Sequence, residues 1–179
     1  SDATKLRYAD WDDLIEYCQL SAAPVGRYLL DIHGENTSDY KYSDALCNAL
    51  QVINHLQDCQ DDYLTLDRVY LPAPWLSEAG IAVEDLKATS TSSGLRQVLD
   101  RTLTGVEGLM PAARELPARL SNRRLAMESA VIVRIADKLI TKLRSGDPLA
   151  SRVALSKIQY ANCCVSGTLS VLLSAGHGS

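Results

Sequence analysis

Apolar residues recur at three- and four-residue steps along most of the chain, a spacing that predicts amphipathic helices. The first such stretch is Leu6 to His33, where Asp10 is a plausible N-cap and Gly34 a natural C-cap. Pro24 and Gly26 fall inside this stretch and predict a kink or break there. The pattern therefore predicts an interrupted helix at the start of the chain.

The same periodicity continues to the end of the sequence. The further predicted elements are a helix at Ser43–Tyr63, an irregular turn at Tyr70–Pro74, a short helix at Ile81–Lys87, a long helix from Ser92 or Ser93 to Glu115 ended by Pro117, a helix from Asn122 to Gly146–Pro148, and a final helix at Ala150–Ser174. In the helix after Asn122 the apolar seam comprises Met127, Val131, Ile135, Leu139 and Leu143. Strand alternation and internal repeats are absent from the pattern, which indicates an all-α protein.

Composition narrows the function classes. The 179 residues suffice for one domain or part of one, and the apolar (46%) and charged (22%) fractions are ordinary for a globular protein. The net charge is −4 and the lysines and arginines are scattered or paired, so we expect no nucleic-acid partner. Five cysteines without a CxxC motif favour reduced thiols and a cytoplasmic localisation.

The most informative spacing is that of the acids in the second predicted helix. Asp58 and Asp62 stand four residues apart, so their carboxylates share a helix face, and Asn54 lies one turn earlier on that face. Two like charges at this spacing destabilise an isolated helix by about 0.2–0.5 kcal/mol. A bound Mg²⁺ would offset that repulsion, because Mg²⁺ prefers carboxylate, water and phosphate oxygens. Arg68 follows as a permanent cation, so the run predicts a site for Mg²⁺ and a diphosphate.

Two motifs carry a resemblance to a known family. The run LQVINHLQDCQDDY followed by LDRVYLP resembles the second aspartate-rich signature of the squalene and phytoene synthase family. The earlier run YCQLSAAPVGRYLL, Tyr17 to Leu30, resembles the family's helix with Tyr-Cys, small residues and Val-Gly. Details of both runs look like the bacterial hopanoid-pathway hydroxysqualene synthases. Many other members have Arg where this chain has Gln57, a departure that removes one cation near the diphosphate.

The resemblance implies an isoprenoid-synthase-type helical bundle in which two aspartate motifs on opposite walls bind Mg²⁺ and a prenyl diphosphate. In the hydroxysqualene branch, presqualene diphosphate loses diphosphate and water captures the carbocation. The alternatives are head-to-head condensation of two farnesyl or geranylgeranyl diphosphates, or a non-catalytic helical partner that retains the fold.

The resemblance also assigns roles to individual residues. Asp58 and Asp62 match the metal-binding motif, with Asn54 as a polar substrate-binding neighbour. Tyr17 matches a catalytic tyrosine of the cavity, near the reacting centre. Arg68 and Tyr70 match residues at the diphosphate end. The alternative role of Tyr17 is packing in the hydrophobic core. Arg27 is expected either to bind the diphosphate or to pair with an acid at a helix end. Asp61 is expected to be solvated, and His55 to serve packing or surface rather than catalysis.

The family's first aspartate motif has no match before Tyr17. We therefore interpret residues 1–179 as a single partial domain, the C-terminal portion of a synthase whose N-terminal helices are absent, and expect this piece to be inactive alone. The face that those helices would cover should be apolar, so a homodimer or helix exchange is expected. Peripheral contact with the inner membrane for product release is a further expectation.

Overall fold

The computed structural model describes residues 5–174, and every regular element in that range is helical, which confirms the all-α prediction. The elements are α1 (Trp11–Ser21), α2 (Ala23–Ile32), the 3₁₀ helix η2 (Thr37–Asp39), α3 (Tyr40–Gln57), α4 (Cys59–Leu66), α5 (Ala73–Glu78), the 3₁₀ helix η3 (Val83–Lys87), α6 (Ser93–Arg119), α7 (Arg123–Ser145) and α8 (Lys157–Ser174). None of these helices combines the length and apolar character needed to cross a bilayer.

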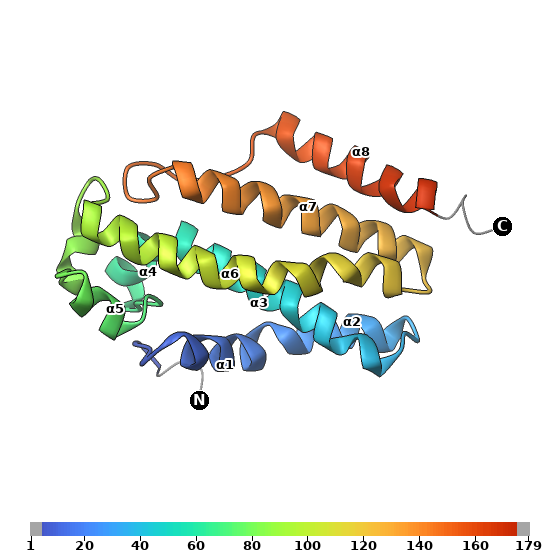
Figure 1. Ribbon diagram of the computed structural model, residues 1–179, viewed down its shortest axis with the longest axis horizontal. Coiled ribbons are helices and arrows are strands. Elements are labelled where there is room, and N and C mark those ends of the chain that lie inside the picture. Colours follow the sequence, from blue (N-terminus) through green and yellow to red (C-terminus); the bar gives the residue numbers. More distant parts are fainter. Residues whose placement is uncertain (1–4, 175–179) are drawn as a thin grey trace.

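The long helices form successive layers. Figure 1 shows α1 and α2 along one edge of the molecule, α3 and α6 in the middle, and α7 and then α8 at the opposite edge. α6 packs against both α3 and α7, whereas α7 is the described helix against which α8 makes extensive contact. Buried leucines such as Leu14, Leu99 and Leu103, each 0–1% exposed, fill the space between α1, α3 and α6. Each fully buried leucine contributes about 1.5–3 kcal/mol relative to an exposed one.

Local signals at the start of the chain act as predicted. The Asp10 carboxylate accepts a hydrogen bond from the Asp13 backbone N–H (2.9 Å) and caps α1. The break between α1 and α2 falls at Ala22, and Pro24 stands in the first turn of α2, where a missing N–H costs nothing. Gly34 follows α2 with φ +68°, a conformation that glycine adopts without a steric penalty.

Three of the predicted helices have boundaries that differ from the structure. The helix predicted at 43–63 begins at Tyr40 and is interrupted at Asp58. α6 continues through Pro117 to Arg119, because burial of the neighbouring Leu116 outweighs the loss of one backbone donor. The final helix begins at Lys157 rather than Ala150.

The loop before α8 has a specific cause. The Asp147 carboxylate accepts hydrogen bonds from the backbone N–H groups of Leu149 (3.0 Å), Ala150 (3.3 Å) and Thr91 (2.8 Å). These bonds hold the backbone after Asp147 in a turn and tie it to the start of α6, so the chain cannot enter a helix there.

The predicted apolar seam of α7 is also wrong in part. Of its five residues only Leu143 is fully buried, and the core-facing stripe is instead made of Val133, Ala136, Ile140 and Leu143. Val131 from the predicted seam faces α8, where Gly167 approaches its backbone. α7 lies between two layers and carries an apolar stripe for each, so one seam could not describe it.

Candidate functional site

The two site aspartates stand at the joint between α3 and α4. Asp58 has non-helical dihedral angles (φ −106°, ψ 12°), yet its N–H donates to Asn54 O (3.0 Å) and its carbonyl accepts from Asp62 N–H (2.8 Å). Helical hydrogen bonding therefore continues across the interruption and keeps the spacing of one turn. Asp61 and Asp62 lie in the first turn of α4, where the partial positive charge of a helix N-terminus favours carboxylates.

The environment of Asp62 opposes its charge. Burial raises the pKa of Asp62, and the nearby Asp58 carboxylate raises it further, whereas the Tyr70 hydroxyl and the Arg68 guanidinium act in the opposite direction. Asp58 is also half-buried, with 27% of its side chain exposed. Asp61 is exposed, as expected. Two carboxylates of like charge at one surface are a suitable donor set for a hard cation that retains several water ligands.

Residues 67–73 bring a cation and a phenol to these carboxylates. The segment is held beside the chain start, since Val69 N–H donates to Leu6 O (3.0 Å) and Ala73 N–H donates to Tyr8 O (3.1 Å). It turns at Asp67, which adopts φ +52° after the end of α4. The left-handed residue reverses the chain, so that the following residues return along α4.

The Tyr70 hydroxyl forms side-chain hydrogen bonds with both Asp62 and Arg68. An acid, a phenol and a guanidinium therefore form one connected cluster. Tyr17 lies close by, with its ring centroid 6.4 Å from that of Tyr70. Of the predicted site residues, the structure thus brings Asp58, Asp62, Arg68, Tyr70 and Tyr17 together, and Asn54 lies one helical turn before Asp58 as an exposed residue.

Arg27 does not belong to this cluster. Its guanidinium forms a bidentate pair with the Asp44 carboxylate on α3, with distances of 2.9 Å from Nε and 2.6 Å from Nη2. Asp44 precedes Asp58 by about 21 Å along the helix axis. Arg27 therefore pairs with an acid, although Asp44 lies beyond the first turn of α3 and not at a helix end, and a contact of Arg27 with the diphosphate stays a prediction.

The sequence reading missed two aromatic neighbours of Tyr70. His55 is 3% exposed and stacks on Tyr70 with a centroid separation of 3.4 Å, and Tyr8 stacks on Tyr70 at 5.8 Å. Burial and, to a lesser extent, the Arg68 charge together lower the pKa of His55 to about 3, so its imidazole is neutral at physiological pH. The Tyr8 hydroxyl and His55 Nδ1 are buried without a hydrogen-bond partner. No local pattern reveals these contacts, because they join three separate segments.

A third missed residue is Arg152. The Gln57 amide donates to the Val153 carbonyl (2.5 Å) and so holds the loop before α8 against the end of α3. This contact places Arg152 Nη2 4.0 Å from Asp58 Oδ1, beside a hollow of about 210 Å³. Gln57 thus brings in a cation from the loop. Arg152 and Asp58 lie far apart in the sequence, and no local signal links them.

The donor set is small. Within residues 5–174, no three His, Cys, Asp or Glu side chains gather closely enough to hold a metal ion without other ligands. Asp58 and Asp62 would therefore supply two carboxylates, and water or phosphate oxygens the remaining positions, which fits the coordination habits of Mg²⁺.

Comparison with known proteins identifies the family. The family model described as "Squalene/phytoene synthase" matches residues 1–159. The chain is 47% identical over 159 residues to the hydroxysqualene synthase of Rhodopseudomonas palustris and 44% identical over 158 residues to that of Sinorhizobium fredii. These matches cover 89% and 88% of this chain but 54% of each relative, so the chain spans about half the length of the curated relatives it matches.

Solved structures agree. The squalene synthase HpnC from Alicyclobacillus acidocaldarius superposes with a TM-score of 0.73 at 33% identity, over 80% of this chain and 54% of that one. A dehydrosqualene synthase solved with a ligand has a TM-score of 0.79 over 97% of this chain and 62% of its own; at 21% identity it shows the fold alone. The isoprenoid-synthase-type fold expected from the sequence is thereby confirmed, and this chain belongs to the squalene/phytoene synthase family.

Proposed function

We propose that this chain carries one wall of a Mg²⁺-dependent prenyl-diphosphate site, and that the reaction served is the conversion of presqualene diphosphate to hydroxysqualene. The observation that supports the proposal most is the cluster of Asp58, Asp62, Tyr70 and Arg68, which joins metal-binding oxygens to a cation and a phenol. The identities of 44–47% to enzymes named hydroxysqualene synthase support the choice of reaction.

Each group has a chemical task in this proposal. Asp58 and Asp62 would hold Mg²⁺, which when bound neutralises the leaving diphosphate as a Lewis acid. The Tyr70 hydroxyl donates to Asp62 and fixes the carboxylate orientation. Arg68 and Arg152 place two further cations beside the acids, where they attract the phosphate oxygens.

The aromatic cluster would serve the carbocation. Tyr17 lies 5.5 Å from Tyr8, 5.9 Å from His55 and 6.4 Å from Tyr70, centroid to centroid. Aromatic faces attract cations, typically by about 0.5–2 kcal/mol. An aromatic ring is also a poor nucleophile, so it does not readily form a bond to the carbocation. Because its imidazole is neutral, His55 adds no positive charge that would repel a cation.

Titration calorimetry with Mg²⁺ and a thiodiphosphate analogue of farnesyl diphosphate tests the site. We expect the analogue to bind only with Mg²⁺ present, and Asp58→Asn and Asp62→Asn to weaken binding by at least about tenfold. Asp61→Asn is the matched control, because Asp61 is an exposed acid one residue away, and it should change the affinity by less than about twofold. Equal effects of the three substitutions, or binding independent of Mg²⁺, would favour the non-catalytic helical partner.

Head-to-head condensation remains the alternative reaction, because a phytoene synthase from Pseudescherichia vulneris is 32% identical over 59% of this chain. In a protein that contains both aspartate motifs, product analysis with farnesyl diphosphate and with presqualene diphosphate separates the two reactions. We propose further that residues 1–179 alone are inactive. Hydroxysqualene formation by this chain at a normal rate would refute that.

The homodimer also stays a proposal. Exposed apolar side chains on α1 and α2, namely Leu20, Val25, Tyr28, Leu29 and Ile32, provide an apolar face for a second helical layer. Sedimentation of the chain as a monomer at high concentration would count against a dimer through this face.

A further inference from the structure

Gln51 and His55 continue the stripe of side chains that carries the site aspartates. Residues 51, 55, 58 and 62 follow one another at steps of four, three and four. At about 100° per residue, these positions lie within about 60° of one another around the helix axis. The backbone hydrogen bonds that continue across Asp58 keep α3 and α4 in phase. The helix face that presents Asp58 and Asp62 therefore also presents His55, one turn earlier, where that face enters the core.

The rings of His55 and Tyr70 are in close face-to-face contact. Their centroids are 3.4 Å apart and their planes 11° from parallel, so the rings overlap with almost no lateral offset. Isolated aromatic pairs prefer an offset or an edge-to-face arrangement, so surrounding contacts must hold this one. The other rings of the cluster, Tyr8 and Tyr17, lie farther from Tyr70, at 5.8 and 6.4 Å. His55 is therefore the ring that most restricts Tyr70.

Both stacked rings are also held by hydrogen bonds. The Gln51 amide nitrogen, one turn earlier on α3, donates to His55 Nε2 (3.2 Å). The Tyr70 hydroxyl forms hydrogen bonds with Asp62 and Arg68. A continuous series of contacts thus runs from Gln51, through two stacked rings, to a carboxylate of the proposed metal site.

Plain core packing does not account for an imidazole at this position. His55 is 3% exposed, and within residues 5–174 its Nδ1 has no hydrogen-bond partner. A buried polar atom without a partner costs free energy that an apolar side chain of similar size would avoid. An aliphatic side chain, however, has neither a flat face for Tyr70 nor an acceptor for Gln51. The imidazole supplies both.

We propose that His55 is a positioning residue of the metal site, which fixes the Tyr70 ring so that its hydroxyl holds the Asp62 carboxylate in the orientation that binds Mg²⁺. This inference rests on the proposed function and adds a residue that acts through Tyr70. Residues that orient a metal ligand in this way typically change metal affinity by about 10–100-fold when they are replaced.

The flip rate of the Tyr70 ring tests the contact without metal or diphosphate. NMR exchange spectroscopy on the 179-residue chain with carbon-13-labelled tyrosine measures it, and Tyr70→Phe identifies the signals. His55→Ala removes the facing ring and should raise the flip rate at least about tenfold, whereas His55→Phe keeps a flat ring and should change it less than about threefold. His33→Ala is the matched control, because His33 is exposed at the end of α2, and it should change the flip rate less than about twofold.

Titration calorimetry with Mg²⁺ and the thiodiphosphate analogue tests the link to the metal site. We expect His55→Ala to weaken binding by at least about tenfold and His55→Phe by less than about threefold. Because His55 acts through the Tyr70 hydroxyl, His55→Ala/Tyr70→Phe should bind within about twofold of Tyr70→Phe alone. A merely structural role predicts no such dependence.

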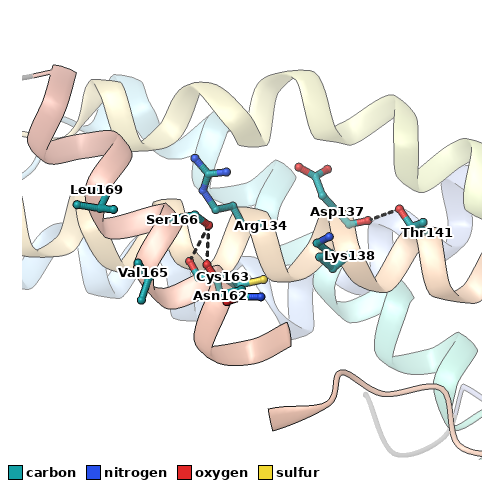
Figure 2. A pocket seen from close by; sticks show the side chains of 9 residues that line it. All are labelled: Arg134, Asp137, Lys138, Thr141, Asn162, Cys163, Val165, Ser166 and Leu169. Carbon is teal, nitrogen blue, oxygen red and sulfur yellow. Dashed lines mark hydrogen bonds between the residues drawn. The ribbon is translucent and has the colours of Figure 1, made fainter. Parts of the chain in front are cut away.

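Thr141→Val controls for the loss of a hydroxyl. Thr141 Oγ1 donates to the Asp137 carbonyl (2.9 Å) on α7, beside a hollow of about 660 Å³ whose lining contains none of the site residues (Figure 2). This variant should bind the analogue within about twofold of the unsubstituted chain. Circular dichroism verifies the fold of each variant, and His55→Leu replaces His55→Ala if that variant unfolds, because leucine fills the space without a flat ring.

The outcomes separate this inference from the proposed function. A chain that binds no analogue with Mg²⁺ refutes the proposed function and this inference with it. If the unsubstituted chain does bind, the inference alone is overturned by an unchanged flip rate in His55→Ala, or by faster flips without weaker binding. It is also overturned if a folded His55→Phe binds as weakly as His55→Ala, or if the two substitutions act independently in the double variant.

Discussion

Two glycines in the middle of long helices offer a controlled test of how α8 is held. Gly167 of α8 and Gly108 of α6 are both helical, and both can be changed to alanine. At Gly108 an added Cβ would meet nothing within 4 Å. At Gly167 it would lie 2.7 Å from Val131 Cα and 2.8 Å from Val131 N, both backbone atoms of α7. The chemical change is the same at both positions, and only the neighbours differ.

The expected magnitudes follow from these distances. Alanine in place of an exposed helical glycine stabilises a protein by about 0.5–1 kcal/mol, which is the full expectation for Gly108→Ala. Ordinary van der Waals contact begins at 3.4 Å, so α8 must withdraw by about 0.7 Å in Gly167→Ala. Overpacking of this kind costs about 1–3 kcal/mol, which exceeds the propensity gain. The two variants should therefore differ by about 1–3 kcal/mol, with Gly167→Ala the less stable.

Urea denaturation followed by circular dichroism measures the two free energies of unfolding, and hydrogen exchange locates the change. Because α8 makes its extensive contacts with α7, its amides should exchange faster in Gly167→Ala while those of α3 and α6 stay protected. If Gly167→Ala matches Gly108→Ala in stability and α8 exchange is unchanged, the close approach of α7 and α8 is refuted.

Three further outcomes follow from the site and the core. Asp62→Asn should raise the free energy of unfolding at about pH 7, because burial and the Asp58 charge raise the pKa of Asp62 in the folded state and so make its charged form unfavourable there. Urea denaturation at a series of pH values should find that this gain vanishes below pH 3.8, the ordinary pKa of an aspartate, because the carboxyl of the unsubstituted protein is then protonated as well. Tyr70→Phe removes a hydroxyl that stabilises the Asp62 carboxylate, so NMR titration should find the pKa of Asp62 higher still, and an unchanged titration would contradict the hydrogen bond. Leu103→Ala, at a position with 0% exposure, should destabilise the fold by about 2.7–5 kcal/mol in urea denaturation, whereas Leu64→Ala, 56% exposed, should change stability by less than about 0.5 kcal/mol.

The spacing of the aspartates could be predicted because it is local. Asp58 and Asp62 remain one turn apart even though the helix is interrupted at Asp58, since backbone hydrogen bonds continue on both sides. The Asp10 cap and the break before Pro24 were likewise correct, because each depends on one residue's side chain or ring. Such features need only neighbours within a few residues.

The neighbours of the site could not be predicted in the same way. His55 was expected to serve packing or surface, and it is packed, but its stacking on Tyr70 depends on where residues 67–73 return. Arg152 meets Asp58 only because Gln57 holds the loop before α8. The pairing of Arg27 with Asp44 depends on how α2 packs on α3, which the local sequence does not reveal.

The sequence alone determined the helical class, most helix positions, the face shared by the two site aspartates, and a family resemblance that the comparisons confirmed. These properties follow from helical periodicity and short-range hydrogen bonds, which the order of residues fixes directly. Only the tertiary structure decided which face of α7 meets the core and which meets α8, and which aromatic rings surround Tyr70. Periodicity fixes where side chains point around one helix axis, but the layer that covers each face depends on the packing of segments far apart in the chain.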